Sequence, residues 1–478
     1  MSEIIPHWLT KQAGLSPDYV ALEFPNGEQI TFKELQQNSE SYARRLAALG
    51  VEAGTRIGVL SANQPEMVYT IHALSYLGAV GILLNTRLSD KELQYQLQDA
   101  EASLLITDTE AKSRSLKIIN QYSFLDLQAT AEADIELLQE IKLNHIFTII
   151  YTSGTTGFPK GVMHTYGNHW WNAIASALNL GLDKADKWLI SLPLFHVSGL
   201  STLLKSVIYG MPIYLMKKFD ESQVHEAIMK KQITVVSVVT VMVQRLIERM
   251  GDERYPKGLR CFLLGGGPAP QALLERAKEK AIPVFQSYGM TETASQIVTL
   301  SPNDALNKLG SAGKPLLPAQ LKIENPGIDG IGEIIVKGPT VTAGYYNNPK
   351  ANKESFSEGW FKTGDLGYID QEGYLYVVDR RTDLIISGGE NIYPSEIENA
   401  LMKMPEIKEA GVTKLEDETW GQIPVAYVVA NKAITETEII IFLKQHLAKY
   451  KLPKKIYFID QLPRNAANKL VRNKLQNK

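Results

Sequence analysis

Apolar and polar residues follow two recurring patterns over roughly the first 300 positions. Residues 56–61 ("RIGVLS") and 79–85 ("AVGILLN") are short apolar runs typical of buried strands, and a helix-like stretch, 64–78, lies between them. The same order recurs at residues 261–289, "CFLLGGGPAPQALLERAKEKAIPVFQSYG". Strands that alternate with helices favour parallel sheets covered by helices. The sequence therefore predicts an α/β fold with a large N-terminal domain of helix-covered, mostly parallel sheets.

Local signals sharpen this picture. "VALEF" and "QITF" flank "PNGE", whose Asn-Gly pair is a strong hairpin signal. Residues 31–50 are expected to form an amphipathic helix with Thr31 as the N-cap and Gly50 just past its end. The most apolar stretch, residues 233–243, is rich in β-branched residues and predicts a buried strand.

The pattern changes after about residue 300. Residues 305–379 are rich in Gly, Tyr and short apolar runs, which predicts a β-rich subdomain within an N-terminal domain of residues 1–379. Helix and strand alternation resumes over residues 384–478, enough for a small α+β C-terminal domain. The polar segment 380–383 between them is the candidate hinge.

Composition narrows the class of protein. The chain has 478 residues and a net charge of −2, which argues against electrostatic binding of nucleic acid or of an anionic membrane. The single cysteine, Cys261, allows no internal disulfide, and its apolar neighbours favour a buried strand thiol over a nucleophile. The N-terminus lacks the pattern of a signal peptide, and residues 233–243 are too short to span a bilayer. We therefore expect a cytoplasmic protein without stable membrane insertion; the sequence leaves open whether it is a homo-oligomer.

The stretch "YTSGTTGFPKG", residues 151–161, has the chemistry of a phosphate-binding loop. Its glycines allow backbone N–H groups to converge on an anion, its hydroxyls donate hydrogen bonds, and Lys160 adds charge. The spacing differs from Gly-x4-Gly-Lys-Ser/Thr, so an ordinary P-loop ATPase or kinase is disfavoured. A flexible linker is the alternative, but it would rarely follow a buried strand or carry a Lys behind a Pro.

Two further loops are expected at the carboxyl edge of the same sheet, where ligands bind. "LLGGGPAP" would let a flat ring approach the backbone, and Tyr288 of "QSYGMTET" could stack on that ring. Thr291 and Glu292 suit Mg²⁺ beside a phosphate. Each feature alone has a plainer reading, because a run of glycines is usually a turn and a lone Glu is usually solvated. Asp365 in "WFKTGDLG" could accept both ribose hydroxyls or could simply form a turn.

Several other residues have two interpretations each. Gly388 and Gly389 could let a thin chain pass or could end a strand. Lys469 lies in a basic tail, and such tails are usually solvated. His196 could be a core histidine, and Lys205 stands in the apolar run "TLLKSVIY", where it must reach the surface or find an anion.

Together these motifs resemble a known group. "YTSGTTGFPKG", "SYGMTET", "TGD", "DRRTDLIISGGENIYPSEIE" and the late lysine of "NKL", in this order, resemble the acyl-adenylate-forming superfamily of acyl-CoA synthetases, adenylation domains and luciferases. The likeness runs from about residue 10 to the end. Within the group, "GNHWWNAIASALNLG", "LPLFHVSGLS", "LLGGGPAP", "QSYGMTETASQIVTLSP" and "LPRNAANKL" resemble the CoA ligases that activate 2-succinylbenzoate in menaquinone biosynthesis.

The resemblance implies a role for each matching residue. Glu292 would help to hold Mg²⁺ and Thr291 would contact the α-phosphate, while Lys469 matches the lysine of the adenylation step. Gly388 and Gly389 would line the channel for coenzyme A. The implied acid pocket contains His196, Lys205 and Gly289. The implied ATP- and AMP-binding residues are Thr152, Ser153, Gly154, Thr155, Thr156, Gly157, Lys160, Gly265, Gly266, Gly267, Pro268, Ser287, Tyr288, Gly289, Met290, Asp365 and Arg380.

The resemblance also implies a two-step reaction that uses ATP, Mg²⁺ and coenzyme A, with the C-terminal domain turning about the hinge between the steps. The chain departs from the family pattern at Asp379, where Gly is usual before the Arg, and at Thr382, where the pivot is often Asp or Lys. The second departure leaves open which residue acts as the pivot. A ligase for another carboxylic acid, an adenylation domain that loads a carrier protein, and a non-catalytic nucleotide-binding regulator are the competing readings.

Overall fold

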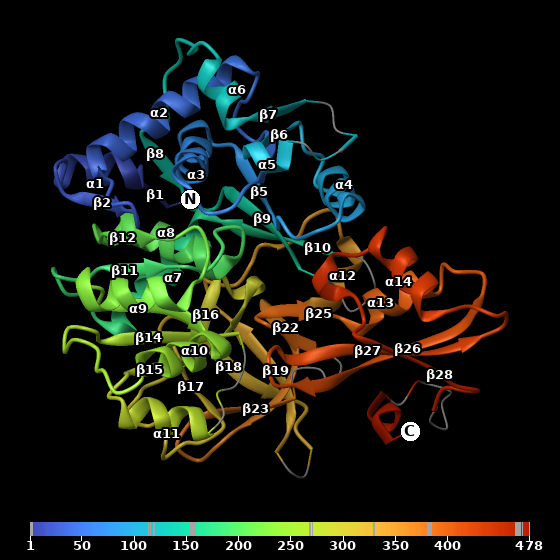
Figure 1. Cartoon of the computed structure of the whole chain (residues 1–478). Helices are drawn as coiled ribbons and strands as arrows, with labels where there is room; N and C mark the ends of the chain where they lie inside the picture. Colours follow the sequence, from blue (N-terminus) through green and yellow to red (C-terminus); the bar gives the residue numbers. More distant parts are fainter. Residues whose placement is uncertain are drawn as a thin grey trace.

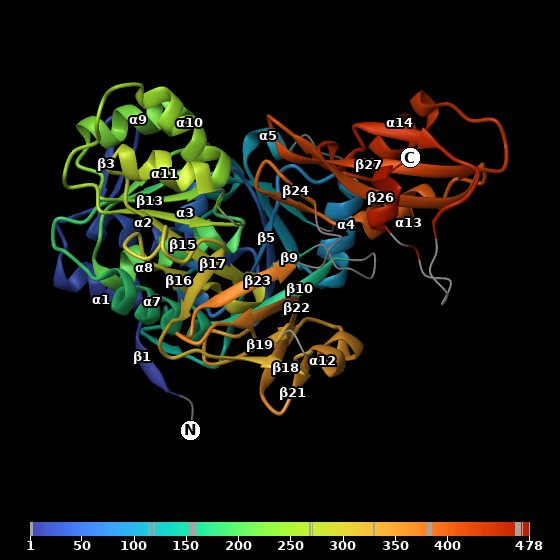
Figure 2. The ribbon, with the colours of Figure 1, turned by 90° about the horizontal axis from the view of Figure 1, so that it is seen from below.

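The computed structural model describes residues 3–112, 114, 116–117, 120–152, 159–266, 269, 271–327, 330–379, 385–463, 470 and 472–477. Two sheets and their helices make up the larger N-terminal part, and the C-terminal residues form a separate layer at its side (Figure 1). Figure 2, in which the molecule is turned, also shows these C-terminal elements beside the N-terminal part. Among the helices of the described residues, none has both the length and the apolar character needed to cross a lipid bilayer.

The first N-terminal sheet is parallel at its centre. Alternate residues of its strands enter different cores: Ile57 and Val59 pack on one face, and Leu60 packs on the other. This two-residue period explains why the strand is apolar at nearly every position. In spatial order the sheet consists of β20 (Gly344–Tyr345), β10 (Lys160–Thr165), β9 (Ile146–Thr152), β5 (Val80–Leu84), β4 (Arg56–Leu60), β6 (Leu104–Thr107) and β7 (Gln121–Ser123).

The second sheet is parallel from β15 to β2. It is antiparallel from β15 to its end at β18, and between β2 and β3. It consists, in order, of β18 (Gln320–Glu324), β19 (Gly332–Lys337), β22 (Trp360–Ile369), β23 (Leu375–Asp379), β17 (Ser311–Pro315), β16 (Ser295–Leu300), β15 (Val284–Met290), β14 (Cys261–Gly265), β13 (Val235–Val239), β11 (Trp188–Ile190), β12 (Ile213–Leu215), β2 (Val20–Glu23) and β3 (Gln29–Thr31), with β21 (Phe356–Ser357) beside β22. The antiparallel strands from β17 onward form the β-rich region expected from the sequence.

The C-terminal layer and a small N-terminal ribbon complete the strands. The layer contains β25 (Glu390–Ile392), β24 (Ile385–Ser387), β27 (Gly421–Ala430), β26 (Ile407–Asp417) and β28 (Lys455–Phe458). The ribbon pairs β1 (Ile4–Pro6) with β8 (Glu140–Lys142). The C-terminal core is separate from the others and gathers apolar residues of these strands and their two helices.

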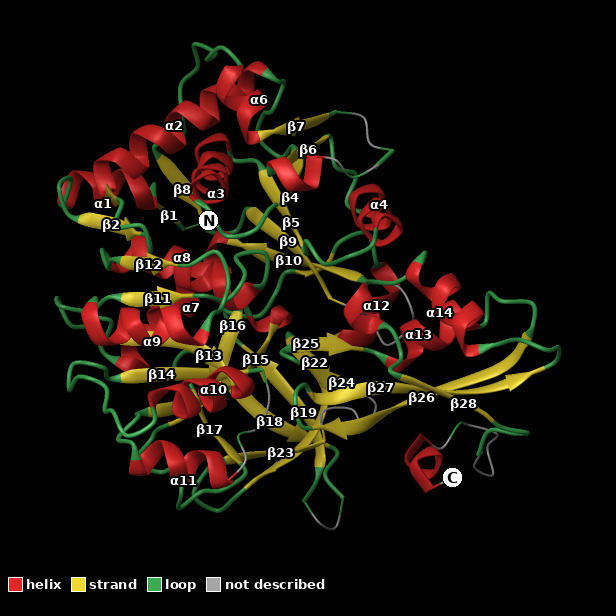
Figure 3. Ribbon diagram, viewed as in Figure 1, coloured by secondary structure: helices red, strands yellow, loops and turns green. Residues whose placement is uncertain are grey.

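Helices cover the sheets, as Figure 3 shows by colour. Apolar residues of α9, α10 and α11 pack together with those of β13 and β14 in one core, so these helices cover one face of the second sheet. The helices are α1 (Trp8–Leu15), α2 (Phe32–Ala48), α3 (Pro65–Leu77), α4 (Asp90–Asp99), α5 (Thr109–Lys112), α6 (Phe124–Ala129), α7 (Tyr166–Leu180), α8 (Val197–Tyr209), α9 (Glu221–Lys230), α10 (Thr240–Met250), α11 (Gln271–Glu279), α12 (Pro349–Ser355), α13 (Pro394–Leu401) and α14 (Glu436–Lys444), with 3₁₀ turns at Thr291–Thr293, Lys449–Lys451 and Arg472–Asn477.

Most local predictions are confirmed. β2 and β3 form the hairpin around Asn26-Gly27. Thr31 caps α2 through a reciprocal capping box with Glu34, and Cys261 is fully buried in β14. The prediction of one strand over residues 233–243 is wrong in its second half, because β13 ends at Val239 and α10 begins at Thr240.

The physical reason lies in the buried positions beyond that point. Val243, Leu246, Ile247 and Met250 are buried, and they recur at spacings of three and four residues. A single apolar run therefore contains both a strand and the first turn of a helix, and β-branched content alone could not separate the two.

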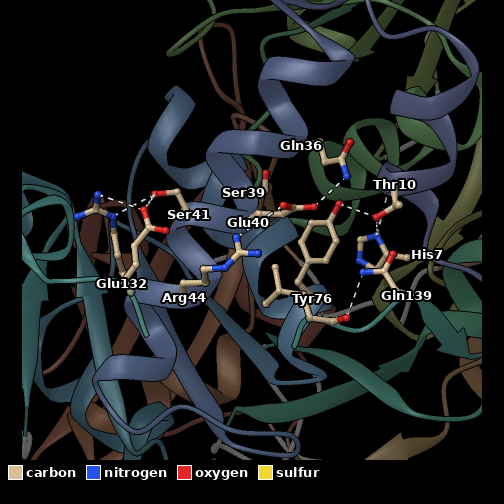
Figure 4. A network of polar contacts seen from close by, with 12 residues as sticks. His7, Thr10, Gln36, Ser39, Glu40, Ser41, Arg44, Tyr76, Glu132 and Gln139 are labelled. Atoms are coloured by element: carbon tan, nitrogen blue, oxygen red, sulfur yellow. Dashed lines mark hydrogen bonds and ion pairs between the residues drawn. The ribbon is translucent and has the colours of Figure 1, made fainter. Parts of the chain in front are cut away.

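The N-terminal helix α1 is fixed to α3 through a buried histidine (Figure 4). His7 stacks on Tyr76 with ring centroids 3.8 Å apart, and its Nδ1 accepts a hydrogen bond from the Thr10 N–H at 3.5 Å. Its Nε2 lies 2.9 Å from the Ser75 hydroxyl, which itself donates to the His72 carbonyl oxygen. Nε2 therefore carries the proton, and the ring is neutral. Burial, with a smaller contribution from His72, lowers the pKa of His7 to about 3.

Candidate active site

One cavity of about 400 Å³ gathers most of the predicted site residues. The described candidates that line it are Thr152, Lys160, His196, Lys205, Gly265, Gly266, Ser287, Gly289, Met290, Thr291, Glu292, Asp365, Gly388 and Gly389. The candidates that lie outside the described residues are Ser153, Gly154, Thr155, Thr156, Gly157, Gly267, Pro268, Arg380 and Lys469. Residues more than 200 positions apart in the chain therefore share one site.

The strand order explains the convergence. β13, β14 and β15 are parallel neighbours, so their carboxyl ends meet at one edge and carry Val239, Gly265 and Met290 to the cavity. The segment 153–159 joins β9 to β10, which pair antiparallel with Lys160 opposite Thr152. Thr152 and Lys160, at the ends of these two strands, both line the cavity; residues 153–158 between them lie outside the described residues.

Glu292 is held at the cavity wall by Tyr345. The Tyr345 hydroxyl donates to Glu292 Oε1 at 2.9 Å, and the Lys160 ammonium lies 4.9 Å from the Tyr345 ring centroid. Burial raises the pKa of the Glu292 carboxyl, while Tyr345 and Lys160 oppose the shift. A cation placed in the cavity would favour the ionised carboxylate. The sequence motifs did not identify Tyr345, because nothing in "GYYNNP" marks one tyrosine as a partner for a distant carboxylate.

Thr291 is positioned by a buried histidine that sequence reasoning also missed. His164 Nε2 donates to the Thr291 carbonyl oxygen at 2.6 Å. Its Nδ1 lies 3.4 Å from the Thr148 hydroxyl, and His169 Nε2 lies 3.2 Å from the same hydroxyl. Burial lowers the pKa of His164 to about 4, so the ring is neutral at pH 7. This network fixes the backbone from which Glu292 projects.

Asp365 is nearly buried and is oriented by Tyr288. The Tyr288 hydroxyl donates to Asp365 Oδ2 at 2.8 Å, and the Asp365 N–H donates to the Thr363 hydroxyl at 3.1 Å. Gly364 has a φ of +74°, in the left-handed region that favours glycine. Asp365 lines the cavity, whereas Tyr288 is buried and is not one of the lining residues. The tyrosine singled out for ring stacking is thus a hydrogen-bond partner of the carboxylate.

Lys205 is a buried amine that lines the cavity. Only 1% of the residue is exposed, and its ammonium lies 5.8 Å from the Trp188 ring centroid. Burial lowers the pKa of Lys205 from 10.5 to about 7. Within the described part of the chain, the structure shows no carboxylate paired with this amine. The sequence allowed two interpretations of Lys205: its amine reaches the surface, or it pairs with an anion. The amine does not reach the surface, so the second interpretation fits the structure.

His196 lies at the start of α8 and meets the C-terminal layer. Its side chain is 38% exposed, and its Nε2 is 3.5 Å from Glu390 Oε2. Glu390 also accepts from Arg87 at 2.8 Å and directly follows Gly388 and Gly389. Both glycines have positive φ, +56° and +86°. His196 is therefore not a core histidine, and the glycine turn closes one side of the cavity.

Comparison with known proteins places this geometry in a family. The family model described as AMP-binding enzyme matches residues 9–346, and the model described as AMP-binding enzyme C-terminal domain matches residues 396–469. The chain belongs to the AMP-binding enzyme family.

Its relatives are similar over their full length. The chain is 59% identical to the 2-succinylbenzoate–CoA ligase of Oceanobacillus iheyensis, over 99% of this chain and 100% of that protein. Among solved structures it is 48% identical to the o-succinylbenzoate CoA synthetase of Bacillus subtilis. A double mutant of that enzyme bound with a product analogue gives a TM-score of 0.95 over 100% of this chain and 99% of that one. The complex with ATP and magnesium ion gives 0.78 over 99% and 100%.

The site also fits a Mg²⁺ ion of the kind that shares its ligands with a substrate. Among the described residues no three His, Cys, Asp or Glu side chains gather closely enough to hold a metal alone. Mg²⁺ commonly takes one or two carboxylates and completes its shell with phosphate oxygens and water. Glu292 lies at the cavity wall and would provide one such carboxylate, and the ion would offset the burial that raises the pKa of this carboxyl.

Proposed function

We propose that the chain is an ATP-dependent, AMP-forming acid–thiol ligase that converts 2-succinylbenzoate to 2-succinylbenzoyl-CoA. AMP and pyrophosphate are released, and the product serves menaquinone biosynthesis. The observation that carries this function is the buried amine of Lys205, which has no carboxylate partner among the described residues and shares its cavity with Glu292, Asp365 and the glycine turn. The full-length likeness to 2-succinylbenzoate–CoA ligases points to the same acid.

The substrate has two carboxylates, and the site has separate places for them. The ring carboxylate pairs with Lys205, which buries two opposite charges together instead of one alone. His196 and Gly289 border the same pocket. Gly289 lies where β16 approaches closely, because a Cβ built there would lie 2.1 Å from the Ser295 carbonyl oxygen. The carboxylate of the succinyl arm then faces the nucleotide.

In the first step, an oxygen of the succinyl carboxylate attacks the α-phosphorus of ATP. A new P–O bond forms and the bond to pyrophosphate breaks, which leaves the acyl-adenylate. Lys160 and the loop that precedes it hold the departing β- and γ-phosphates, and Asp365 with Arg380 holds the ribose. Mg²⁺ bound at Glu292 supplies positive charge to the phosphate oxygens. Lys469 supplies charge on the acid side of the phosphorus.

In the second step, the sulfur of coenzyme A attacks the acyl carbon. The C–S bond forms, the C–O bond to AMP breaks, and the thiol proton leaves to solvent. The thiol arm enters past Gly388 and Gly389, which lie at the cavity. Lys469 and the thiol arm of coenzyme A cannot both reach the adenylate at the same time. We therefore expect residues 384–478 to rotate relative to residues 1–379 between the steps, about the hinge at residues 380–383. The different TM-scores against two complexes of one relative, 0.95 and 0.78, support two arrangements.

We place the enzyme in the cytoplasm, where ATP and coenzyme A are available. The experiment that tests the function is CoA-thioester formation from ATP, coenzyme A and a panel of acids. Among these, 2-succinylbenzoate should give the highest kcat/KM and equal amounts of AMP and thioester. A higher value for a monocarboxylic acid would refute the assignment of substrate but not of reaction type. Acyl transfer only to a carrier protein, with none to free coenzyme A, would refute the reaction type.

A further inference from the structure

A buried triad of charges joins the two parts of the chain. Lys451 Nζ lies 2.6 Å from Glu92 Oε1 and 2.7 Å from Glu396 Oε1. Lys451 and Glu396 belong to the C-terminal part, whereas Glu92 belongs to α4 of the N-terminal part. All three side chains are at least nine-tenths buried. The proposed reaction does not use any of them, although Lys451 lines the cavity.

The triad is held in place on both sides. Glu92 Oε2 accepts from the Ser89 N–H and hydroxyl at 2.8 and 2.7 Å, which completes the capping box of α4. Around the triad, Ala448 and Tyr450 pack in the apolar cluster of the N-terminal sheet. The Lys91 ammonium lies 3.1 Å from His446 Nε2. The segment 446–451 therefore covers α4, and Lys451 is its most deeply buried charge.

The charge balance makes Lys451 essential to this contact. One ammonium faces two carboxyl groups, so Lys451 is the cation to which both of them bind. The carboxylates in turn raise the pKa of Lys451 despite its burial. Burial also raises the pKa of Glu396, and Glu92 adds to that effect. Without Lys451 the two carboxylates would share a buried site unpaired, which strongly disfavours the arrangement that brings them together.

We propose that Lys451 is a positioning residue which holds the C-terminal part in the arrangement that forms the thioester. This inference rests on the proposed two-step function and assigns the contact that stabilises one of its two arrangements. The structure matches the product-analogue complex of the relative with a TM-score of 0.95, so the triad belongs to that arrangement. When the C-terminal part turns, Lys451 and Glu396 move away from Glu92 together, and Lys451 keeps one carboxylate partner.

The test separates the two half-reactions in Lys451→Met. Thioester formation from supplied 2-succinylbenzoyl-AMP and coenzyme A should fall about tenfold or more, because the variant leaves two unpaired carboxylates in the triad. Pyrophosphate release from ATP and the acid should stay within about twofold. Lys449→Met, which removes an exposed charge two residues away, should change neither step. Equal losses in both half-reactions, or no loss in the second, would overturn the inference.

A rescue experiment distinguishes the triad from a direct contact with coenzyme A. Glu92→Gln removes one charge but preserves the capping box, since Gln serves at that position. In the Lys451→Met background it should restore at least a third of the lost rate of thioester formation. Absence of rescue would show that Lys451 acts through the thiol substrate or through folding, and would overturn the inference.

One readout is independent of the acid. Hydrogen exchange in α4 should be faster in Lys451→Met than in Lys449→Met, because residues 446–451 cover α4 only in the arrangement described here. If the wild-type protein made no thioester from 2-succinylbenzoate, the proposed function would be refuted. The exchange experiment would still test whether the triad holds residues 446–451 against α4. Unchanged exchange in α4 would overturn the inference whatever the activity.

Discussion

Replacing Lys205 by Met should weaken recognition of the dicarboxylic acid while making the free protein more stable. The amine is fully buried, and lowering its pKa from 10.5 to about 7 corresponds to roughly 4–5 kcal/mol of desolvation at about 1.4 kcal/mol per pH unit. The unfolded chain binds this proton at every pH below 10.5, whereas the folded chain binds it fully only well below pH 7. Burial of the amine therefore destabilises the protein most below pH 7, and the penalty fades as the pH rises toward 10.5.

The ring carboxylate of the substrate would offset that desolvation, and the variant loses the pairing. Breaking a buried ion pair by removing one partner costs about 3–5 kcal/mol. The KM for 2-succinylbenzoate should accordingly rise by about 100-fold or more. For 4-oxo-4-phenylbutanoate, which lacks the ring carboxylate, the KM should stay the same or fall. Met conserves the shape of the Lys side chain and keeps the pocket filled. The comparison of the two acids is therefore not affected by a newly created cavity.

The assay is thioester formation with both acids at saturating ATP and coenzyme A, together with thermal unfolding of the free proteins at pH 7 and pH 9. The unfolding midpoint of Lys205→Met should exceed that of the wild type at pH 7, by less at pH 9. Binding of the dicarboxylate at pH 8 should take up a proton in the wild type only, seen by titration calorimetry in buffers of different ionisation enthalpy. Equal changes in KM for the two acids, or a less stable variant at pH 7, would refute the assignment of Lys205.

The remaining predictions concern the two steps and the acid limit of stability. Lys469→Ala should lose pyrophosphate release by at least about 100-fold and still form thioester from supplied acyl-adenylate; equal loss of both steps would contradict the alternation. Gly389→Leu should do the reverse, because its φ of +86° disfavours any side chain and a Cβ there would lie 3.5 Å from Val239; normal thioester formation would contradict a channel at this turn. Burial lowers the pKa of His7 to about 3 and of His72 to about 4. Below pH 6.5 these histidines bind protons in the unfolded state but not in the folded state. The free energy of unfolding should therefore fall by about 2 kcal/mol per histidine at pH 5. Calorimetry of His72→Phe should show a weaker pH dependence than the wild type between pH 5 and 6.5, and an unchanged dependence would refute this role of burial.

Much of the site could be predicted because its residues lie in contiguous motifs. The order of strands and helices places the loops after β14 and β15 at one edge, and Gly265 and Glu292 do line one cavity. The hairpin at Asn26, the capping box at Thr31 and the burial of Cys261 follow from signals that act over a few residues. Local periodicity was insufficient where strand and helix share one apolar run, at Val239 and Thr240.

The residues that position the site could not be predicted in the same way. Tyr345 reaches Glu292, and His164 reaches the Thr291 carbonyl, across 53 and 127 residues of chain. Lys451 and Glu92 are 359 residues apart. Each of these side chains is common in its own sequence context, and each acquires a role only from the packing of separate sheets. A sequence motif marks groups that touch a ligand in order along the chain, but it does not mark the partners that hold them.

The burial of Lys205 has a consequence for how the enzyme selects its acid. The protein bears the desolvation of the amine before any substrate arrives, so an acid with a second carboxylate in the right place regains it. An acid of the same shape without that carboxylate leaves the amine unpaired. Sites built around a buried polar group reject such analogues far more strongly than apolar pockets reject a missing methylene. In the proposed reaction, residues 152–160 and Glu292 bind parts of ATP that are the same for every acid. On the proposed assignment, selection of the acid depends on Lys205, and a change of substrate would require replacing Lys205 before any residue of the nucleotide site.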